Sequence, residues 1–174
     1  MLKMIFIVLI MLVVTALILA ALKPDNFSIS RTVSIKATPE KIAPLISDFH
    51  NMQTWSAWEK VDPAMQRNYS GADRGVGAHY AWQGNKDIGS GSMEITESSL
   101  TKIAMKLDFT APFEAHNMVE FTLTPNGDST TVTHVMSGPS PYISKVMSLV
   151  FSMDKMVGTK FEEGLANLKA NAEK

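Results

Sequence analysis

The sequence predicts an α+β domain in which a curved antiparallel sheet packs against one long C-terminal helix, with a separate apolar helix before it. Three observations lead to this prediction. An uncharged apolar run lies close to the N-terminus. The middle of the chain alternates apolar and polar residues with period two, which is typical of strands with one buried face. The last part instead carries apolar residues at helical spacing.

The apolar run extends from Met4 to Leu22, which is 19 residues without a charge. A helix of that length spans about 28 Å, close to the thickness of a bilayer's hydrocarbon core. Lys3 and Lys23 flank the run, where their ammonium groups can reach the lipid headgroups. We therefore expect residues 1–23 to be a single-pass membrane anchor and residues 24–174 to be one domain.

A cleaved signal peptide is the alternative interpretation of the same run. Such peptides have a shorter apolar region, about 7–15 residues, followed by small residues at the cleavage site. Ile18 stands where an A-x-A pattern ending at Ala20 needs a small residue. The pattern therefore favours the anchor, whereas the flanking lysines do not decide which side of the membrane the domain faces.

The domain begins with a strand and short helices. Residues 27–36 alternate with period two, with Arg31 interrupting the apolar face near a rim. Thr38 and Pro39 are typical of a helix start, and the apolar residues that follow have helical spacing. A second short helical segment is expected through Trp55 and Trp58.

Between Met65 and Met136 the chain predicts about six strands separated by turn signals. Four of them contain clear alternation, for example at Val119, Phe121 and Leu123. The segment Pro125–Asp128 predicts a hairpin turn. Because the strands follow one another closely, the sheet should be an antiparallel meander.

The C-terminal part, from Tyr142 to about Asn171, is expected to form one helix after Gly138, Pro139 and Pro141 end the sheet. Its apolar stripe is broad. Gly158 and Gly164 lower helix propensity by about 1 kcal/mol each relative to Ala. They are expected to mark a bend or a close approach to the sheet.

Composition excludes several classes of function. The chain has no cysteine, so disulfides and thiolate metal sites are not available. Without Lys3 and Lys23, 14 basic residues face 17 acidic ones, which argues against a nucleic-acid partner. The four histidines lack the spacing of a helical metal site, and residues 71–77 lack the Lys-Ser/Thr of a phosphate-binding loop. No metal and no cofactor is expected.

Five segments resemble one known family. They are SRTVSIKATPEKIAPLISDF (30–49), MQTWSAWEKVDP (52–63), GVGAHYAWQGN (75–85), GSGSMEITES (89–98) and MDKMVGTKFEEGLANLK (153–169). Together they resemble the START-like, or SRPBCC, superfamily, in its polyketide cyclase/dehydrase and lipid-transport branch. The resemblance implies a helix-grip fold around an apolar cavity that binds lipids, polyketides or similar molecules. It implies no universal catalytic motif, and His134 replaces an aromatic residue expected in the branch.

Ten residues are expected to line this cavity because they are apolar or aromatic and lie on the strand faces and helices that would enclose it. The aromatic residues with a polar tip suit an apolar pocket that orients one polar group, and Met suits a cavity that adapts its shape. The alternative is that the aromatic residues and the methionines simply fill the core. The ten are Trp55, Trp58, Tyr80, Trp82, Met105, Phe109, Phe121, His134, Met136 and Phe151.

His134 is the weak catalytic candidate. A histidine on the concave face could polarise a carbonyl or act as a general base, with Glu94 or Asp108 as a nearby acid. The alternative is a core histidine satisfied by a neighbouring hydroxyl group. His116 lies near Glu114 and is expected at a rim.

The sequence therefore favours a membrane-anchored domain that binds a hydrophobic ligand, either a lipid or a polyketide-like molecule. One alternative is a cyclase or dehydratase that acts in the same cavity. Another is a regulatory or interaction module whose interior is filled, and no protein partner is indicated for it. The size of the cavity separates these hypotheses, and a carboxylate beside His134 would favour the enzyme.

Overall fold

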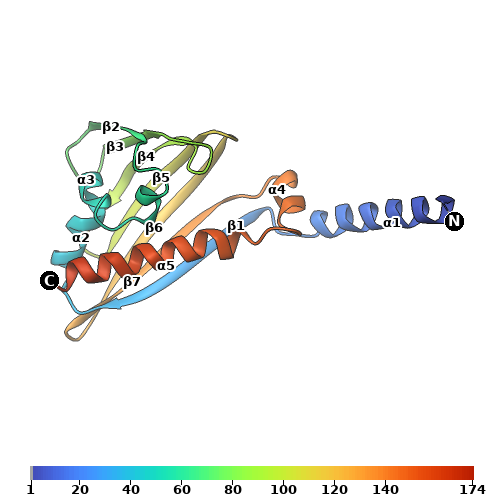
Figure 1. Cartoon of the computed structure of the whole chain (residues 1–174). Helices are drawn as coiled ribbons and strands as arrows, with labels where there is room; N and C mark the ends of the chain where they lie inside the picture. The colour runs from blue at the N-terminus through green and yellow to red at the C-terminus, as the bar shows by residue number, and fades with distance from the viewer. Residues whose placement is uncertain (1) are drawn as a thin grey trace.

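A computed structural model describes residues 2–174 and contains one seven-stranded sheet, short helices and one long C-terminal helix (Figure 1). The predicted α+β class is confirmed. In chain order the elements are α1 (Leu2–Ala21), β1 (Asn26–Ile35), α2 (Pro39–Ser47), α3 (Phe49–Met52), the 3-10 helix η1 (Ala57–Lys60), β2 (Gln66–Gly71), β3 (Ala78–Gln83), β4 (Ser90–Ser98), β5 (Lys102–Ala111), β6 (Ala115–Asn126), β7 (Ser129–Pro139), α4 (Tyr142–Met147) and α5 (Met153–Ala172).

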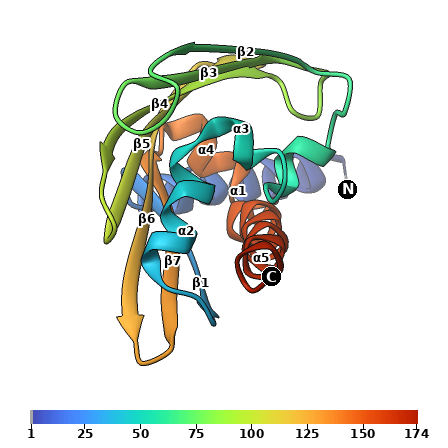
Figure 2. The same ribbon diagram turned by 90° about the vertical axis from the view of Figure 1, so that its left-hand side faces the viewer.

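The sheet is antiparallel throughout and follows the order β1-β7-β6-β5-β4-β3-β2. Strands β2 to β7 form the predicted meander, and β1 closes the sheet by pairing with β7. The sheet curves around α5, while α2 and α3 lie beside one end of that helix (Figure 2). The concave face and α5 therefore enclose the interior of the domain.

Alternation along the strands decides which side chains reach this interior. On β6, Val119, Phe121 and Leu123 are buried while their neighbours are half-buried or exposed. Ile42 and Ile46 of α2 and Leu168 of α5 are fully buried and complete the core at the end near the C-terminus. The alternate residues of the period-two pattern on β6 are therefore buried, as the sequence predicts.

Gly158 lets β1 and α5 approach closely. A Cβ at this position would collide with the guanidinium group of Arg31, which lies across α5. Arg31 Nε donates to Glu162 Oε1 at 2.5 Å and Nη1 donates to Asp154 Oδ1 at 3.0 Å. The expected close approach is present, and α5 continues as one α-helix through both glycines.

The prediction of one helix from Tyr142 to about Asn171 is wrong, because α4 ends at Met147 and α5 begins at Met153. The side chain of Ser152 accepts a hydrogen bond from the backbone N–H of Lys155 and caps α5. Such a cap gives the backbone an alternative to a continuous helix. The break allows α4 to turn away from α5 and to pack against the end of α1.

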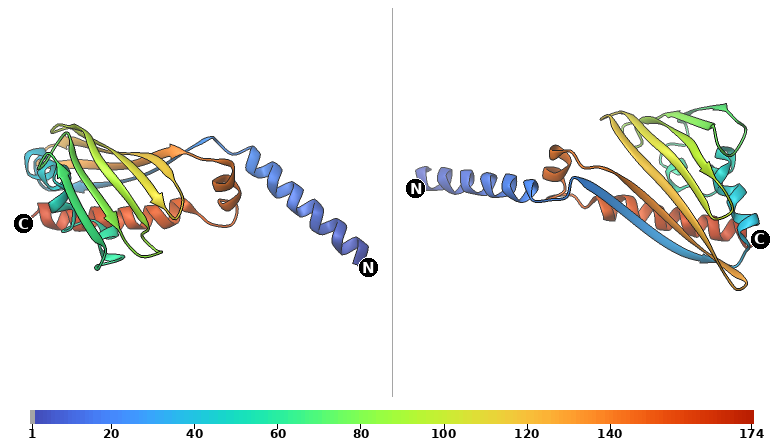
Figure 3. Two further views of the ribbon diagram at one scale, coloured as in Figure 1. Left: turned by 90° about the horizontal axis from the view of Figure 1, so that it is seen from above. Right: turned by 180° about the vertical axis from the view of Figure 1, so that it is seen from behind.

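Helix α1 extends away from the domain (Figures 1 and 3). The segment Lys3–Ala21 has a mean hydropathy of 3.2 and is long and apolar enough to cross a membrane. Its side chains from Met4 to Val14 are exposed. Its C-terminal turns contact α4 of the domain.

Candidate functional site

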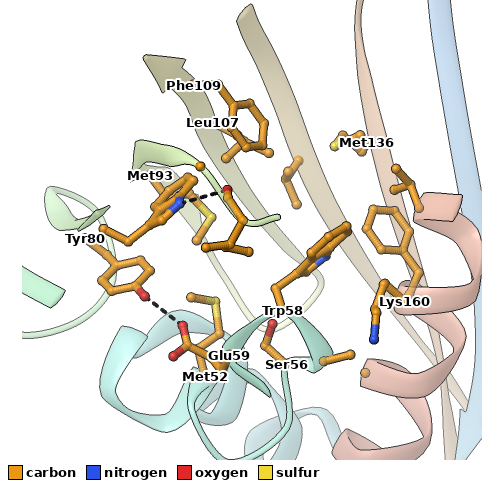
Figure 4. Close-up of a pocket in the computed structure, with 18 of the residues that line it drawn as sticks. Met52, Ser56, Trp58, Glu59, Tyr80, Met93, Leu107, Phe109, Met136 and Lys160 are labelled. Carbon is orange, nitrogen blue, oxygen red and sulfur yellow. Dashed lines mark hydrogen bonds between the residues drawn. The ribbon is translucent and has the colours of Figure 1, made fainter. Parts of the chain in front are cut away.

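A cavity of about 360 Å³ lies between the concave face of the sheet, η1 and α5 (Figure 4). Nine of the ten residues expected there line it: Trp55, Trp58, Tyr80, Trp82, Met105, Phe109, Phe121, His134 and Met136. Phe151 does not, because it lies in the break between α4 and α5 with 60% of its surface exposed. The hypothesis of a filled interior is therefore not supported.

The wall is largely aromatic and sulfur-containing. Tyr80 and Trp82 of β3 stack with ring centroids 5.9 Å apart, and Trp82 and Phe109 of β5 form a T-shaped pair with ring centroids 5.6 Å apart. Figure 4 shows Met93, Met136 and Leu107 around the same space. Met side chains are flexible, so this part of the wall can adjust to the shape of a ligand.

The polar tips of most wall aromatics are already engaged within the protein. Trp55 Nε1 donates to the carbonyl oxygen of Leu45 at 2.7 Å. The hydroxyl group of Tyr80 donates to Glu59 Oε1 at 2.7 Å (Figure 4). These groups therefore stabilise the wall and are not free to bind a ligand.

Glu59 of η1 is the first polar centre of the cavity, and the sequence did not single it out. Its carboxylate is 7% exposed and accepts from Tyr80 and, through Oε2, from Arg67 Nε at 2.8 Å. Burial and the hydrogen bond to Glu59 raise the pKa of Tyr80. The only sequence signal is an acidic residue that directly follows Trp58 in the aromatic segment, and its cation Arg67 comes from a different element.

His134 of β7 is the second polar centre. It is 8% exposed, and its ring stacks between Phe121 at 4.1 Å and Phe161 of α5 at 3.7 Å. Its Nδ1 atom is buried and has no hydrogen-bond partner among the described residues. Burial lowers the pKa of His134 to about 3, so the imidazole is neutral at neutral pH.

The expected partners of His134 lie elsewhere. No hydroxyl group satisfies its Nδ1, contrary to the alternative of a hydroxyl-bonded core histidine. Asp108 instead binds His116 at 2.7 Å, and Glu94 is exposed on β4. The hydrogen bond that His116 donates to Asp108 raises the pKa of His116, which is exposed at the rim as expected.

Exposed lining residues mark the mouth of the cavity. Lys86 and Asp87 belong to the β3–β4 connection, Pro112 to the β5–β6 connection and Met156 to the first turn of α5. Lys160, one turn further along α5, is partly exposed and pairs with Glu163 at 3.1 Å. Within residues 2–174 no group of three or more His, Asp or Glu side chains could hold a metal ion.

Comparison with known proteins gives one family and one fold. The family model for polyketide cyclase / dehydrase and lipid transport matches residues 26–173. No curated protein matches the chain significantly.

Several solved structures share the fold. The Aha1 dimer from Colwellia psychrerythraea is 18% identical, with a TM-score of 0.59 over 84% of this chain and 96% of that one. Protein MLL2253 from Mesorhizobium loti is 16% identical, with a TM-score of 0.60 over 83% and 96%. DynU16, a putative protein in the dynemicin biosynthetic locus, is 15% identical, with a TM-score of 0.58 over 85% of this chain and 47% of that one.

Proposed function

Because this chain belongs to the polyketide cyclase/dehydrase and lipid transport family, we propose that it is a membrane-anchored protein that binds one neutral hydrophobic molecule. The observation that carries the proposal is the neutral imidazole of His134, which lines an apolar cavity and whose buried Nδ1 has no partner among the described residues. The ligand's apolar body fills the cavity, and its one polar group makes a hydrogen bond with His134.

The cavity is suited to a small hydrophobic molecule. Its volume of about 360 Å³ is at the lower end of the range of ligand sites, about 300–1,000 Å³. Burial of apolar surface contributes about 25 cal/mol per Å² before the costs of association. Affinity therefore comes mainly from the aromatic and methionine wall, whereas orientation comes from His134.

The charges around the cavity favour a neutral ligand. Glu59 already has two donors, and Lys160 pairs with Glu163 at the mouth. A carboxylate held beside His134 would bring its charge into the apolar interior, whereas the lysines Lys86 and Lys160 lie at the mouth, and burying that charge is costly. A neutral imidazole offers one donor and one acceptor, which suits an alcohol, ketone or ester.

His134 does not have the surroundings of a general base. No carboxylate orients its ring, and its depressed pKa makes it a poor proton acceptor near neutral pH. Binding without chemistry is therefore favoured over a cyclase or dehydratase reaction.

The anchor provides access to such a ligand. A molecule that partitions into lipid is most concentrated in the membrane, and the segment Lys3–Ala21 would keep the domain, residues 24–174, beside it. Sequencing the N-terminus of the mature protein tests this part. We expect a chain that retains α1; a chain that begins near residues 21–26 would show that a signal peptide had been removed.

Mass spectrometry of co-purified molecules tests the binding proposal. We expect the full chain, purified from membranes in detergent, to carry a stoichiometric neutral hydrophobic compound. Met93→Trp is the matched control, because Met93 lines the cavity on β4 and a larger side chain there fills it (Figure 4). Equal recovery from both proteins, or no compound from either across several detergents, would contradict the proposal.

A further inference from the structure

We propose that the segment Tyr142–Met156 lies in the headgroup region of the bilayer that α1 spans and holds the cavity mouth against the membrane. We call it the juxtamembrane segment; it comprises α4, the break after it and the first turn of α5. Ligand then passes between bilayer and cavity without crossing water. This inference rests on the proposed anchor and adds a second membrane contact to it.

Specific contacts attach this segment to the end of α1. The hydroxyl group of Tyr142 donates to the carbonyl oxygen of Leu17 at 2.8 Å. Lys23 Nζ, just beyond the helix, donates to the carbonyl oxygen of Ser148 at 3.1 Å. Leu17 is one turn before Ala21, about 6 Å along the helix axis. If α1 spans a bilayer, the segment lies at the depth where hydrocarbon gives way to headgroups.

The segment has the inverse of an ordinary burial pattern. Lys145 is 6% exposed and pairs with Asp25 at 2.5 Å, whereas Ile143 and Met147 on the same helix are 65% and 50% exposed. Large apolar side chains at the surface continue through the break and into α5. They are Tyr142, Ile143, Met147, Leu149, Val150, Phe151, Met153 and Met156. A contiguous exposed patch of this kind marks an interaction surface.

Sheet topology brings another exposed apolar side chain, from outside the juxtamembrane segment, to the same end of the domain. Asn26 at the start of β1 pairs with Pro139 at the end of β7, so α1 and α4 attach at the edge of the sheet that these strand ends form. In an antiparallel meander the β3–β4 and β5–β6 connections lie at that edge too. Phe113 of the β5–β6 connection is 76% exposed there. Figure 3 shows this connection on the α1 side of the domain.

The cavity opens at this edge as well. Its exposed lining residues, Asp87, Pro112 and Met156, come from the β3–β4 connection, the β5–β6 connection and the first turn of α5. Met156 belongs both to the mouth and to the juxtamembrane segment. A membrane surface in contact with that segment would therefore face the mouth.

Charges at this edge are mixed. Lys86 and Lys155 lie among Asp87, Glu114 and Asp154, all of them exposed. Attraction to anionic lipid is therefore weak, and the contact depends on apolar burial. Vesicles of phosphatidylcholine are a sufficient probe.

The absence of cysteine allows a direct test with the full chain. Single variants Val150→Cys and Phe113→Cys, labelled with an environment-sensitive fluorophore, are reconstituted into phosphatidylcholine vesicles. Leu100→Cys is the matched control, because Leu100 is 48% exposed in the β4–β5 turn at the opposite edge. Val8→Cys reports on α1 itself.

We expect the labels at Val150 and Phe113 to be blue-shifted and to be quenched by lipid-borne nitroxides, as at Val8, while the label at Leu100 stays aqueous. An aqueous label at Val150 together with a lipid-embedded label at Val8 would overturn the inference and leave the anchor intact. A blue-shifted label at Val150 that lipid nitroxides do not quench would also overturn it, because a second copy would then cover the segment. An aqueous label at Val8 would overturn the anchor and the inference together.

Transfer kinetics test the functional part. The double variant Val150→Asp/Phe151→Asp should take up a fluorescent neutral lipid from phosphatidylcholine vesicles about tenfold more slowly than the wild type, the factor that corresponds to about 1.4 kcal/mol in the barrier. Leu100→Asp is the control and should leave the rate unchanged. Equal rates in the double variant and the wild type would contradict direct exchange with the bilayer.

Discussion

Glu59 and His134 are both more than nine-tenths buried in the wall of the same cavity, yet only Glu59 has its hydrogen-bond partners. Tyr80 and Arg67 satisfy both carboxylate oxygens of Glu59, whereas Nδ1 of His134 lacks a partner among the described residues. A buried polar group without a partner costs about 1–3 kcal/mol. The difference shows that Glu59 is held within the wall, and it is the reason why the proposed function assigns the ligand's polar group to His134.

Removing the carboxylate of Glu59 should have the largest effect on stability at neutral pH. In Glu59→Ala, Tyr80 and the largely buried Arg67 lose their shared partner, and we expect a loss of about 3 kcal/mol in the free energy of unfolding. Denaturant unfolding of the detergent-solubilised chain measures it. Glu94→Ala, at an exposed position on β4, is the control. A similar loss of unfolding free energy in both variants would contradict a structural role of Glu59.

Acid should destabilise the protein through His134. Its pKa is about 3 when folded and about 6.5 when unfolded, so between these values the unfolded chain binds a proton that the folded chain excludes. This contribution is fully present above pH 6.5 and decreases by about 1.4 kcal/mol per pH unit below it. The difference in unfolding free energy between wild type and His134→Phe should therefore depend on pH between 6.5 and 4. A constant difference would show that His134 is not buried in its neutral form.

Tyr80→Phe should have a smaller effect, because Glu59 keeps its ion pair with Arg67 and loses one donor. We expect a destabilisation of about 1–2 kcal/mol, measured by the same unfolding experiment. Tyr69→Phe is the matched control, because the hydroxyl group of Tyr69 contacts Gln53 in an exposed hydrogen bond. A larger effect at Tyr69 than at Tyr80 would contradict this ranking.

His134→Phe should have the smallest effect on stability at neutral pH. The substitution removes an unsatisfied polar atom and keeps an aromatic ring between Phe121 and Phe161. We expect a change between zero and a gain of about 1 kcal/mol in the free energy of unfolding. A loss above about 2 kcal/mol would show that the imidazole itself stabilises the folded wall.

The fold was predictable wherever one side of a helix or strand is buried. In such elements the apolar residues recur at every second position of a strand or at helical spacing, and this pattern is visible in the sequence. This is why nine of the ten expected residues line the cavity. Phe151 was wrongly expected in the cavity because the apolar stripe of α5 is continuous in sequence with an exposed apolar segment before it. Hydrophobic spacing alone does not distinguish a side chain that faces a core from one that faces lipid.

The polar part of the site could not be predicted in the same way. Glu59 and Arg67 meet only after η1 folds against β2 and β3, and no local spacing encodes that contact. The isolation of His134 also depends on Phe161 of α5, a helix that follows the sheet in the chain. Candidate acids near His134 in the strands, Glu94 and Asp108, are exposed or paired with a different residue.

Competition between 1-decanol and decanoate for the cavity tests the central claim most directly, in wild type and in His134→Phe. We expect the wild type to bind the alcohol at least about tenfold more tightly at pH 7, since a hydrogen bond to a buried partner contributes about 1.4 kcal/mol and burying a carboxylate beside His134 is costly. The alcohol should lose about that factor in His134→Phe. Tighter binding of decanoate, or an unchanged affinity for the alcohol in His134→Phe, would contradict a neutral ligand held by His134.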